Sequence, residues 1–257
     1  MLVITPSGRR EDCSGPAPAG FEPCRFQGRT VGYYPSGRAI TDVCLRTREA
    51  LTRGRVMILY IDGLGYPLFE RAPLPAVRRR FRCEPAHTAY PPLTQPCMAS
   101  MLTGVWPDEH GVCSRRDHRP LVPSLMAEPG AVLIEGDSAP LALEQEPVLT
   151  LPTQGESVDA AVLRAALPYA AGGARLLIVH FHGLDDLEHD VGDDESRLLD
   201  KLAEIDSAVD ALCAAFSGLA ILCADHGVHP VAGHGGHGDF DPRDMFVPYG
   251  EAMLCAD

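Results

Sequence analysis

Acidic and imidazole side chains recur in this chain directly after apolar runs. Asp62 follows the run VMILYI, and the pair Asp225 and His226 follows the run LAILCA. Carboxylate and imidazole groups in combination are ligands that suit zinc and similar divalent cations. The sequence therefore predicts a metal centre assembled from segments that lie far apart along the chain.

Two further segments carry the same chemistry. Asp185 and His189 lie in HGLDDLEHDVG, and His234 and His237 lie in GHGGHGDF. Each segment taken alone also has an ordinary structural interpretation, because Asp-Gly after a strand is typical of a turn, and charged or glycine-rich segments are typical of solvated loops. Their joint occurrence after apolar runs is what favours a common site.

Thr94 stands in front of a predicted helix start. Pro96 suits the first turn of a helix, and Gly104 suits its end. The free N–H groups and the dipole at a helix N-terminus favour an anion, and a metal-coordinated hydroxyl group there can ionise and attack phosphorus. The alternative interpretation is that Thr94 is only the N-cap of the helix, which by itself predicts no chemistry.

Four short apolar runs, separated by helical patterns, must position these groups. Runs of this length are typical of strands buried on both faces of a sheet. Apolar residues three or four positions apart predict a helix between residues 198 and 216, and a second helix is predicted over residues 157–167. The alternation predicts an α/β fold with a mostly parallel central sheet and helices on both faces. The runs cover residues 56–61, 131–136, 175–181 and 219–224.

The candidate ligands follow three of these four runs. Open α/β sheets place ligand sites at the carboxyl ends of their strands. We therefore expect three aspartates and two histidines to converge on one edge of the sheet. They are Asp62, Asp185, His189, Asp225 and His226.

Other parts of the chain carry weaker patterns. Residues 1–37, rich in glycine, proline and arginine, are expected to form an irregular N-terminal arm with a short strand around residues 29–34. Ser36 is expected to cap a helix over residues 39–52, and residues 138–154 to form a surface loop. The sequence shows no internal repeat and no linker, so we expect a single domain over all 257 residues.

The composition bears on the partners and the compartment. The net charge of −13 argues against a nucleic acid polymer or an anionic membrane as the main partner. No stretch approaches the roughly 20 apolar residues of a membrane span, and the N-terminus, with charges after its short apolar start, is the reverse of a secretory signal. Nine scattered cysteines without a CxxC pair are typical of reduced thiols, so we expect a cytoplasmic protein; the oligomeric state stays open.

Five segments together resemble the alkaline phosphatase superfamily, in particular its nucleotide pyrophosphatase/phosphodiesterase branch. They occur in the family's order between residues 56 and 240: VMILYIDGLG, TQPCMASMLTGVWPDEHGV, DDLEHDVG, ADHG and GGHGDF. The resemblance implies an alkaline phosphatase-like core. Larger members carry inserted segments that build a substrate cap, and the short chain leaves room for little or no cap domain.

The resemblance also implies two divalent metal ions, with zinc favoured and manganese as the alternative. For the last ligand we prefer His237 to His234, because HGDF followed by FVPYG resembles the family's final histidine-glycine and closing strand. His110, after the nucleophile helix, is expected to be structural. The implied ligands of the first ion are Asp62, Thr94, Asp225 and His226, and those of the second are Asp185, His189 and His237.

By the same resemblance, Thr94 attacks phosphorus and forms a phosphothreonine that is then hydrolysed. Diesterases of this branch place an asparagine 21 residues after the nucleophile, and this chain has Arg115 there, beside Arg116. A guanidinium can bind two oxygens of a more highly charged phosphate, although both arginines are equally typical of a solvated loop. The sequence therefore predicts a metal-dependent phosphatase, with phosphomonoesters slightly favoured, acting on a small phosphorylated metabolite or nucleotide.

Several alternatives stay open. A phosphodiesterase or nucleotide pyrophosphatase and a phosphonate hydrolase use nearly the same residues, and a non-catalytic metal-binding protein can share the fold. A sulfatase is not expected, because Thr94-Gln95-Pro96-Cys97-Met98 lacks the family's C/S-x-P-x-R pattern. A mutase of the superfamily would need an inserted domain, for which the chain has no room. The natural substrate is not indicated.

Overall fold

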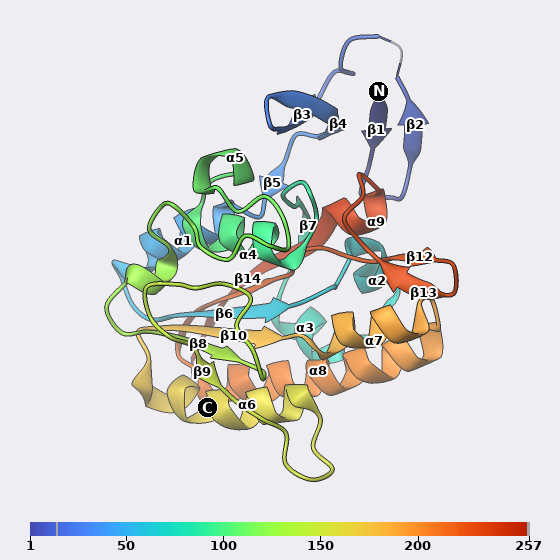
Figure 1. Ribbon diagram of the computed structural model, residues 1–257. Helices are drawn as coiled ribbons and strands as arrows, with labels where there is room; N and C mark the ends of the chain where they lie inside the picture. Colours follow the sequence, from blue (N-terminus) through green and yellow to red (C-terminus); the bar gives the residue numbers. More distant parts are fainter. Residues whose placement is uncertain (14, 256–257) are drawn as a thin grey trace.

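An eight-stranded sheet forms the centre of the computed structural model, which describes residues 1–13 and 15–255 (Figure 1). Strands β6, β8, β10 and β11 run parallel to one another, while β14 is antiparallel to both β11 and β7. The predicted α/β fold with a mostly parallel sheet is therefore confirmed. In spatial order the strands are β5 (Arg38–Ala39), β7 (Glu84–His87), β14 (Phe246–Leu254), β11 (Gly218–Cys223), β6 (Val56–Ile61), β10 (Leu176–Phe181), β8 (Ala131–Glu135) and β9 (Val148–Leu149).

Helices cover both faces of this sheet. Figure 1 shows α6 and α8 along one face and α1 and α4 along the other, and helix α6 packs against β8 and β10 while α1 packs against β6 and β11. The helices are α1 (Asp42–Leu51), α2 (Tyr66–Arg71), α3 (Pro75–Arg80), α4 (Thr94–Thr103), α5 (Pro107–His110), α6 (Val158–Pro168), α7 (Gly183–Val191), α8 (Glu195–Ala215) and α9 (Pro242–Met245), with short helical turns η1 (Leu125–Ala127) and η2 (Tyr169–Gly173). In the described part of the chain, no helix combines the length and the apolar character that crossing a membrane requires.

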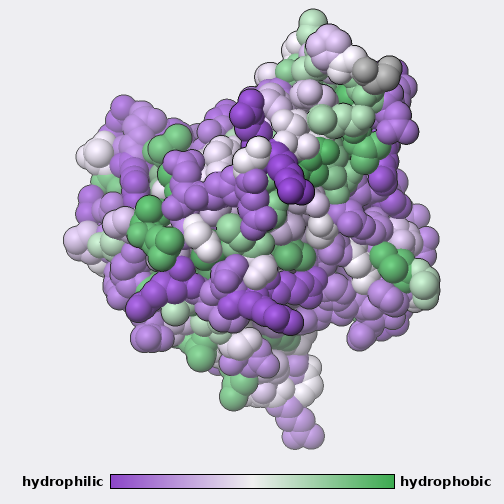
Figure 2. Space-filling model, turned by 45° about the horizontal axis from the view of Figure 1, so that its top comes forward, coloured by the Kyte–Doolittle hydropathy of each residue, from purple (hydrophilic) through white to green (hydrophobic). Residues whose placement is uncertain are grey.

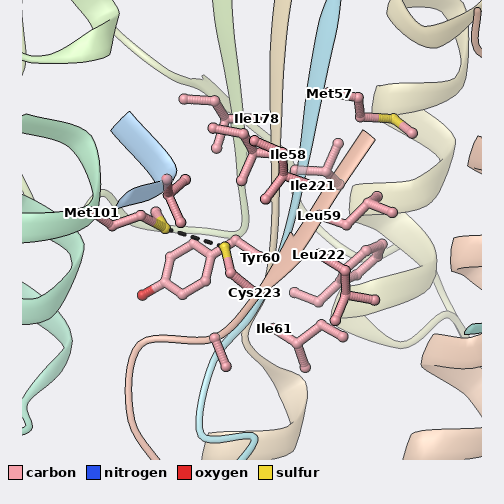
Figure 3. Close-up of a cluster of buried hydrophobic side chains, with 14 of the residues drawn as sticks. Met57, Ile58, Leu59, Tyr60, Ile61, Met101, Ile178, Ile221, Leu222 and Cys223 are labelled. Carbon is pink, nitrogen blue, oxygen red and sulfur yellow. Dashed lines mark hydrogen bonds between the residues drawn. The ribbon is translucent and has the colours of Figure 1, made fainter. Parts of the chain in front are cut away.

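Burial on both faces explains why the central strands read as continuous apolar runs. Every residue of β6 is buried. The side chains point alternately to the two faces, Met57, Leu59 and Ile61 to one and Ile58 and Tyr60 to the other (Figure 3). Because helices cover both faces of the sheet, both sets of side chains are shielded from water, which favours apolar residues in the strand.

The start of the chain forms a second, smaller sheet of four strands, so the expectation of an irregular arm over residues 1–37 was wrong. The one strand expected there, around residues 29–34, is present as β4 (Arg29–Pro35). The turn between β3 and β4 is made by Gln27 and Gly28, both with positive φ. Such turns usually contain Asn-Gly or Asp-Gly, so this hairpin had little sequence signal. The strands, in spatial order, are β2 (Arg10–Asp12), β1 (Leu2–Ile4), β4 (Arg29–Pro35) and β3 (Phe21–Phe26).

The small sheet packs on the segment that leads into the last strand. Its buried side chains Ile4, Cys24 and Tyr34 form a cluster with Phe240 and Met245, and the cluster also includes Phe246. The sheet forms a projecting lobe at the upper right of Figure 2, where hydrophobic residues gather on a surface that is otherwise mostly hydrophilic. The start of the chain is thereby fixed against residues 240–246, a segment that includes α9 and the first residue of β14.

Two local expectations were also corrected. Helix α1 begins at Asp42 after Thr41, which makes no side-chain capping bond, so Ser36 is not its cap. The stretch 138–154 is mostly loop, but Val148–Leu149 adds the edge strand β9 to the sheet. Neither feature changes the position of the strands that carry the candidate ligands.

Candidate active site

The carboxyl ends of three adjacent strands bring the candidate ligands together. Asp62 follows β6, Asp225 and His226 follow β11, and Asp185 lies in α7, which follows β10. Nε2 of His226 lies 3.4 Å from Oδ1 of Asp62 and 3.3 Å from Oδ2 of Asp225. The parallel register of β10, β6 and β11 causes this convergence, because their last residues are side by side.

Ligand atoms gather in two overlapping groups. In each group the atoms lie within 4.8 Å of one another, and His226 belongs to both. This differs from the expected division, in which His226 served one ion only. His189 lies beside the second group, with Nε2 3.3 Å from Oδ2 of Asp185. The first group is Asp62, Asp225 and His226, and the second is Asp185, His226 and His237.

The chemistry of the groups fits divalent cations. Oδ1 of Asp62, Oδ1 of Asp185 and Oδ2 of Asp225 are buried, and none of them has a hydrogen-bond partner in the described structure. Buried carboxylate oxygens without partners are costly, and a cation would satisfy them. The residues present therefore suit metal binding.

The closely spaced charged groups of the site shift one another's pKa values. Burial and the neighbouring carboxylates Asp225 and Asp185 raise the pKa of Asp62. Burial also works against the charged form of Asp185, but a hydrogen bond with His189 and the nearby His226 and His237 hold the pKa of Asp185 well below its usual value. Closely spaced carboxylates disfavour one another's charged forms, which is the condition that a bound cation relieves.

Thr94 is the first residue of α4 and lies at this site. Its Oγ1 atom is 3.3 Å from Nε2 of His226. The N-cap position is occupied by Leu93, and none of the described side chains caps the helix, so the interpretation of Thr94 as a mere N-cap is wrong. Gly104 ends the helix, as expected, and has the left-handed conformation. Two turns further along the same helix, Met101 contacts Cys223 of β11 (Figure 3), which fixes α4 against the strand that leads to the site.

The two histidines of the glycine-rich segment differ in position. Nδ1 of His237 donates to the carbonyl of Pro92 at 2.9 Å, and its ring stacks on His226 with centroids 3.7 Å apart. Its Nε2 lies 3.9 Å from Oδ1 of Asp185. His234 lies in β13 (His234–Gly236), which pairs with β12 (His229–Val231), and belongs to neither ligand group.

Arg115 reaches the edge of the site from the loop after α5. Its Nη2 atom lies 2.7 Å from Nε2 of His237. Arg116 is exposed beside it, and its backbone N–H donates to Oγ of Ser114. Of the two neighbouring arginines, Arg115 is the one that contacts a candidate ligand.

His110 is buried away from the ligand groups. Its Nε2 lies 2.9 Å from Oγ of Ser100, and its Nδ1 accepts from the backbone N–H of Val112 at 3.1 Å. Burial lowers the pKa of His110 to about 4, which keeps the ring neutral. It therefore links α4 to the segment that follows α5.

A buried polar layer beneath Asp62 was missed in the sequence. Nε2 of His180 lies 3.1 Å from Oδ2 of Asp62, and Nδ1 of His180 lies 2.6 Å from Oε2 of Glu135. Burial alone would lower the pKa of His180, but the two carboxylates outweigh it and hold that pKa well above the usual value. A histidine inside the otherwise apolar run LLIVHF was the available signal.

Glu188 was also missed, although it is the last residue of the segment DDLE that contains Asp185. It lies in α7 and is buried, with Oε2 unpartnered in the described structure. Burial, followed by the nearby Asp185, raises the pKa of Glu188 well above its usual value. Gly63 has a φ of +78°, which favours glycine, and a Cβ atom there would lie 2.6 Å from Oε2 of Glu188 and 3.1 Å from Cα of Asp185.

Comparisons with known proteins identify the family and the fold. The sequence pattern of the type I phosphodiesterase / nucleotide pyrophosphatase family matches residues 56–122 and 144–241. Murine ectonucleotide pyrophosphatase / phosphodiesterase 5 has a similar structure, with a TM-score of 0.53 and 15% identity over 69% of this chain and 58% of that chain. Phosphonoacetate hydrolase from Sinorhizobium meliloti 1021 gives a TM-score of 0.51 and 16% identity over 81% of this chain and 60% of that chain. Both similarities show the fold.

A curated relative matches a shorter stretch. GPI ethanolamine phosphate transferase 2 of Aspergillus fumigatus is 35% identical over 79 residues, which cover 27% of this chain and 10% of that protein. The chain thus matches about a tenth of the length of this relative and less than two thirds of the two solved chains. The family pattern, in contrast, spans every residue of the two ligand groups.

Proposed function

The chain belongs to the type I phosphodiesterase / nucleotide pyrophosphatase family, and we propose that it hydrolyses phosphoester bonds with Thr94 as the nucleophile and two divalent cations as cofactors. One observation carries the proposal. Oγ1 of Thr94, at the N-terminus of α4, lies 3.3 Å from Nε2 of His226, and His226 belongs to both ligand groups.

The ligand groups define where the cations would bind. Asp62, Asp225 and His226 would hold one, and Asp185, His226 and His237 the other, with His189 beside the second group. Bound there, divalent cations supply the positive charge that attracts a phosphate and favours an ionised hydroxyl group. The mixture of carboxylate and imidazole ligands favours zinc, with manganese as the alternative.

The chain's own groups then account for the reaction. Oγ1 of Thr94 loses its proton and forms a bond to phosphorus while the bond from phosphorus to the leaving oxygen breaks, which gives a phosphothreonine and, once the leaving oxygen takes up a proton, an alcohol. Water then attacks the same phosphorus while the bond from phosphorus to Oγ1 breaks. Phosphate is released, and one proton of the water restores the hydroxyl group of Thr94. The backbone N–H groups in the first turn of α4 favour the negative charge of a phosphate bound beside Thr94.

Arg115 supports a preference for phosphomonoesters. Its guanidinium is 2.7 Å from His237 of the second ligand group, and a guanidinium binds the dianionic phosphate of a monoester more strongly than the singly charged phosphate of a diester. The proposed substrate is a small phosphorylated metabolite or nucleotide in the cytoplasm. The similar proteins named above act, by their names, on nucleotide, phosphonate or ethanolamine phosphate groups, which supports chemistry at phosphorus without selecting a leaving group.

Hydrolysis of p-nitrophenyl phosphate by the zinc-loaded protein tests the proposal. We expect Thr94→Ala to lower kcat by at least about a thousandfold, Thr94→Ser to retain part of the activity, and Thr103→Ala, at the other end of the same helix, to retain nearly all of it. Acid-quenched wild type should carry phosphate on Thr94. Full activity in Thr94→Ala would contradict the proposal. Cation binding without hydrolysis of monoesters, diesters or phosphonates would favour a non-catalytic metal-binding protein.

A further inference from the structure

Three buried polar side chains lie in a row on one face of the central sheet. Glu135 ends β8, His180 lies in β10 next to it, and Asp62 follows β6 on the other side. The register pairs Tyr60 with His180 and Ile134 with Val179. Paired residues point to the same face, and so does a residue two positions further along, which is why these three side chains meet.

The row is continuous in hydrogen-bonding groups. Nδ1 of His180 lies 2.6 Å from Oε2 of Glu135, and Nε2 of His180 lies 3.1 Å from Oδ2 of Asp62. The exposed fractions are 1% for Glu135, 1% for His180 and 3% for Asp62, so water does not compete for these contacts. Each ring nitrogen therefore faces one carboxylate oxygen.

Tyr60 fixes the plane of the imidazole ring. The rings of Tyr60 and His180 are stacked, with centroids 4.0 Å apart and an angle of 4° between their planes. A ring held in this way cannot rotate without breaking both contacts with the carboxylates. The direction of the N–H group towards Asp62 is thus set by the sheet itself.

The two oxygens of Asp62 have different surroundings. Oδ2 faces His180, whereas Oδ1 has no hydrogen-bond partner in the described structure and lies 3.4 Å from Nε2 of His226. Oδ1 is therefore the oxygen that faces the first ligand group. Because a carboxylate is planar, the contact of His180 with Oδ2 also fixes the direction of Oδ1.

Stability alone does not explain this arrangement. The other residues of β10 are apolar, and a buried charged or polar pair is generally no more stabilising than well-packed apolar side chains of similar volume. The polar residue occurs at the one position of the strand from which it reaches Asp62.

We propose that His180, held by Glu135 and Tyr60, is a positioning residue that orients Asp62 so that Oδ1 faces the first candidate cation site. The inference rests on the proposed function, because it assigns a role towards the proposed cation. Partners of this kind around metal ligands typically change metal affinity by about 10- to 100-fold when they are removed.

Calorimetric titration of the cation-free protein with Zn²⁺ or Mn²⁺ alone tests the proposal. His180→Phe keeps the stacking on Tyr60 and removes both N–H donors. We expect it to weaken one of the two binding events by about 10- to 100-fold. The matched control is His182→Phe, two residues further along, where the histidine pairs with Asp186 outside the row, and we expect unchanged affinities. Equal affinities in wild type and His180→Phe, or equal losses in the two variants, would overturn the proposal.

A double-mutant cycle separates positioning from a general structural effect. In an Asp62→Asn background there is no carboxylate to orient, so adding His180→Phe should weaken the remaining cation binding less than about threefold. If His180→Phe lowers the cation affinity of the Asp62→Asn protein as much as it lowers that of wild type, the proposal is overturned. If His180→Phe does not fold, His180→Gln and Glu135→Gln replace it, with an expected loss of about 3- to 10-fold, and wild-type affinity in both would overturn it.

The proposed function and this inference fail in different ways. A protein that binds cations in a His180-dependent manner but hydrolyses no phosphoester would refute the function and support the positioning role. An active enzyme whose cation affinities do not change when His180 is replaced would refute the positioning role and leave the proposed function intact.

Discussion

Nη2 of Arg115 lies 2.7 Å from Nε2 of His237, although 122 positions separate the two residues. Because Nδ1 of His237 donates to the carbonyl of Pro92, Nε2 is the nitrogen that accepts from Arg115. The same nitrogen faces Asp185 at 3.9 Å. A cation at the second group would take this lone pair, and we expect the guanidinium to turn to a bound phosphate instead.

Replacement of Arg115 should therefore affect monoesters more than diesters. We expect Arg115→Ala to lower kcat/KM for p-nitrophenyl phosphate by roughly 10- to 100-fold, the range for a lost hydrogen bond to a charged group, and to lower that for bis-p-nitrophenyl phosphate much less. Arg116→Ala, the neighbouring exposed arginine, is the control and should change neither value. A substrate preference that is the same in wild type and Arg115→Ala would refute this role.

Cation removal should destabilise the protein. Without a cation, buried oxygens of Asp62, Asp185 and Asp225 have no hydrogen-bond partner in the described structure. Saturation with zinc at about 100 times its Kd should raise Tm by roughly 5–10 °C. Asp225→Asn removes one of the repelling charges, so the cation-free variant should be at least as stable as cation-free wild type and gain less from zinc. Differential scanning calorimetry with chelator and with zinc measures both values. An undiminished zinc effect in Asp225→Asn would show that the cation binds elsewhere.

A side chain at Gly63 should destabilise the fold more than one at Gly155. Gly63 and Gly155 have nearly the same φ, +78° and +79°, but a Cβ atom meets Glu188 and Asp185 only at Gly63. Gly155→Ala should therefore cost only the left-handed strain of about 1–2 kcal/mol, and Gly63→Ala a further ~1–3 kcal/mol from overpacking. Urea unfolding in chelator compares the two. Equal losses would indicate that Glu188 moves aside freely.

Protonation of His87 should destabilise the fold in mild acid. The ring is stacked between Tyr34 and Trp106, and burial lowers the pKa of His87 to about 4, even though Glu22 lies 3.4 Å from its Nε2. Between the unfolded value of about 6.5 and this folded value, the unfolded chain binds more protons. The stabilisation of the fold by the neutral His87 ring is therefore complete above about pH 6.5 and is lost progressively as the pH falls to about 4.

Comparison with His87→Phe, which retains the stacking, isolates this effect. Wild type should lose roughly 2–3 kcal/mol more unfolding free energy than the variant between about pH 7.5 and about pH 4.5. Urea unfolding at the two pH values provides the measurement. Parallel losses in the two proteins would show that His87 does not govern this part of the acid sensitivity.

The central sheet could be predicted because its strands are buried on both faces. Continuous apolar runs of this length are typical of such strands, and Asp62 after β6 and Asp225 after β11 therefore marked the edge of the sheet. The N-terminal sheet could not be predicted in the same way. Its strands are partly exposed and its main turn uses Gln27 rather than asparagine or aspartate, so neither the apolar pattern nor the turn residues indicated it.

The sequence by itself determined which chemical groups are present and at which strand ends they lie, because these follow from local patterns of apolar, acidic and glycine residues. Only the tertiary structure decided that His226 belongs to both ligand groups, that Arg115 contacts His237, and that His180 lies behind Asp62. Contacts of this kind join residues that are distant in sequence, and their lengths depend on how strands pair and helices pack, which no local pattern contains.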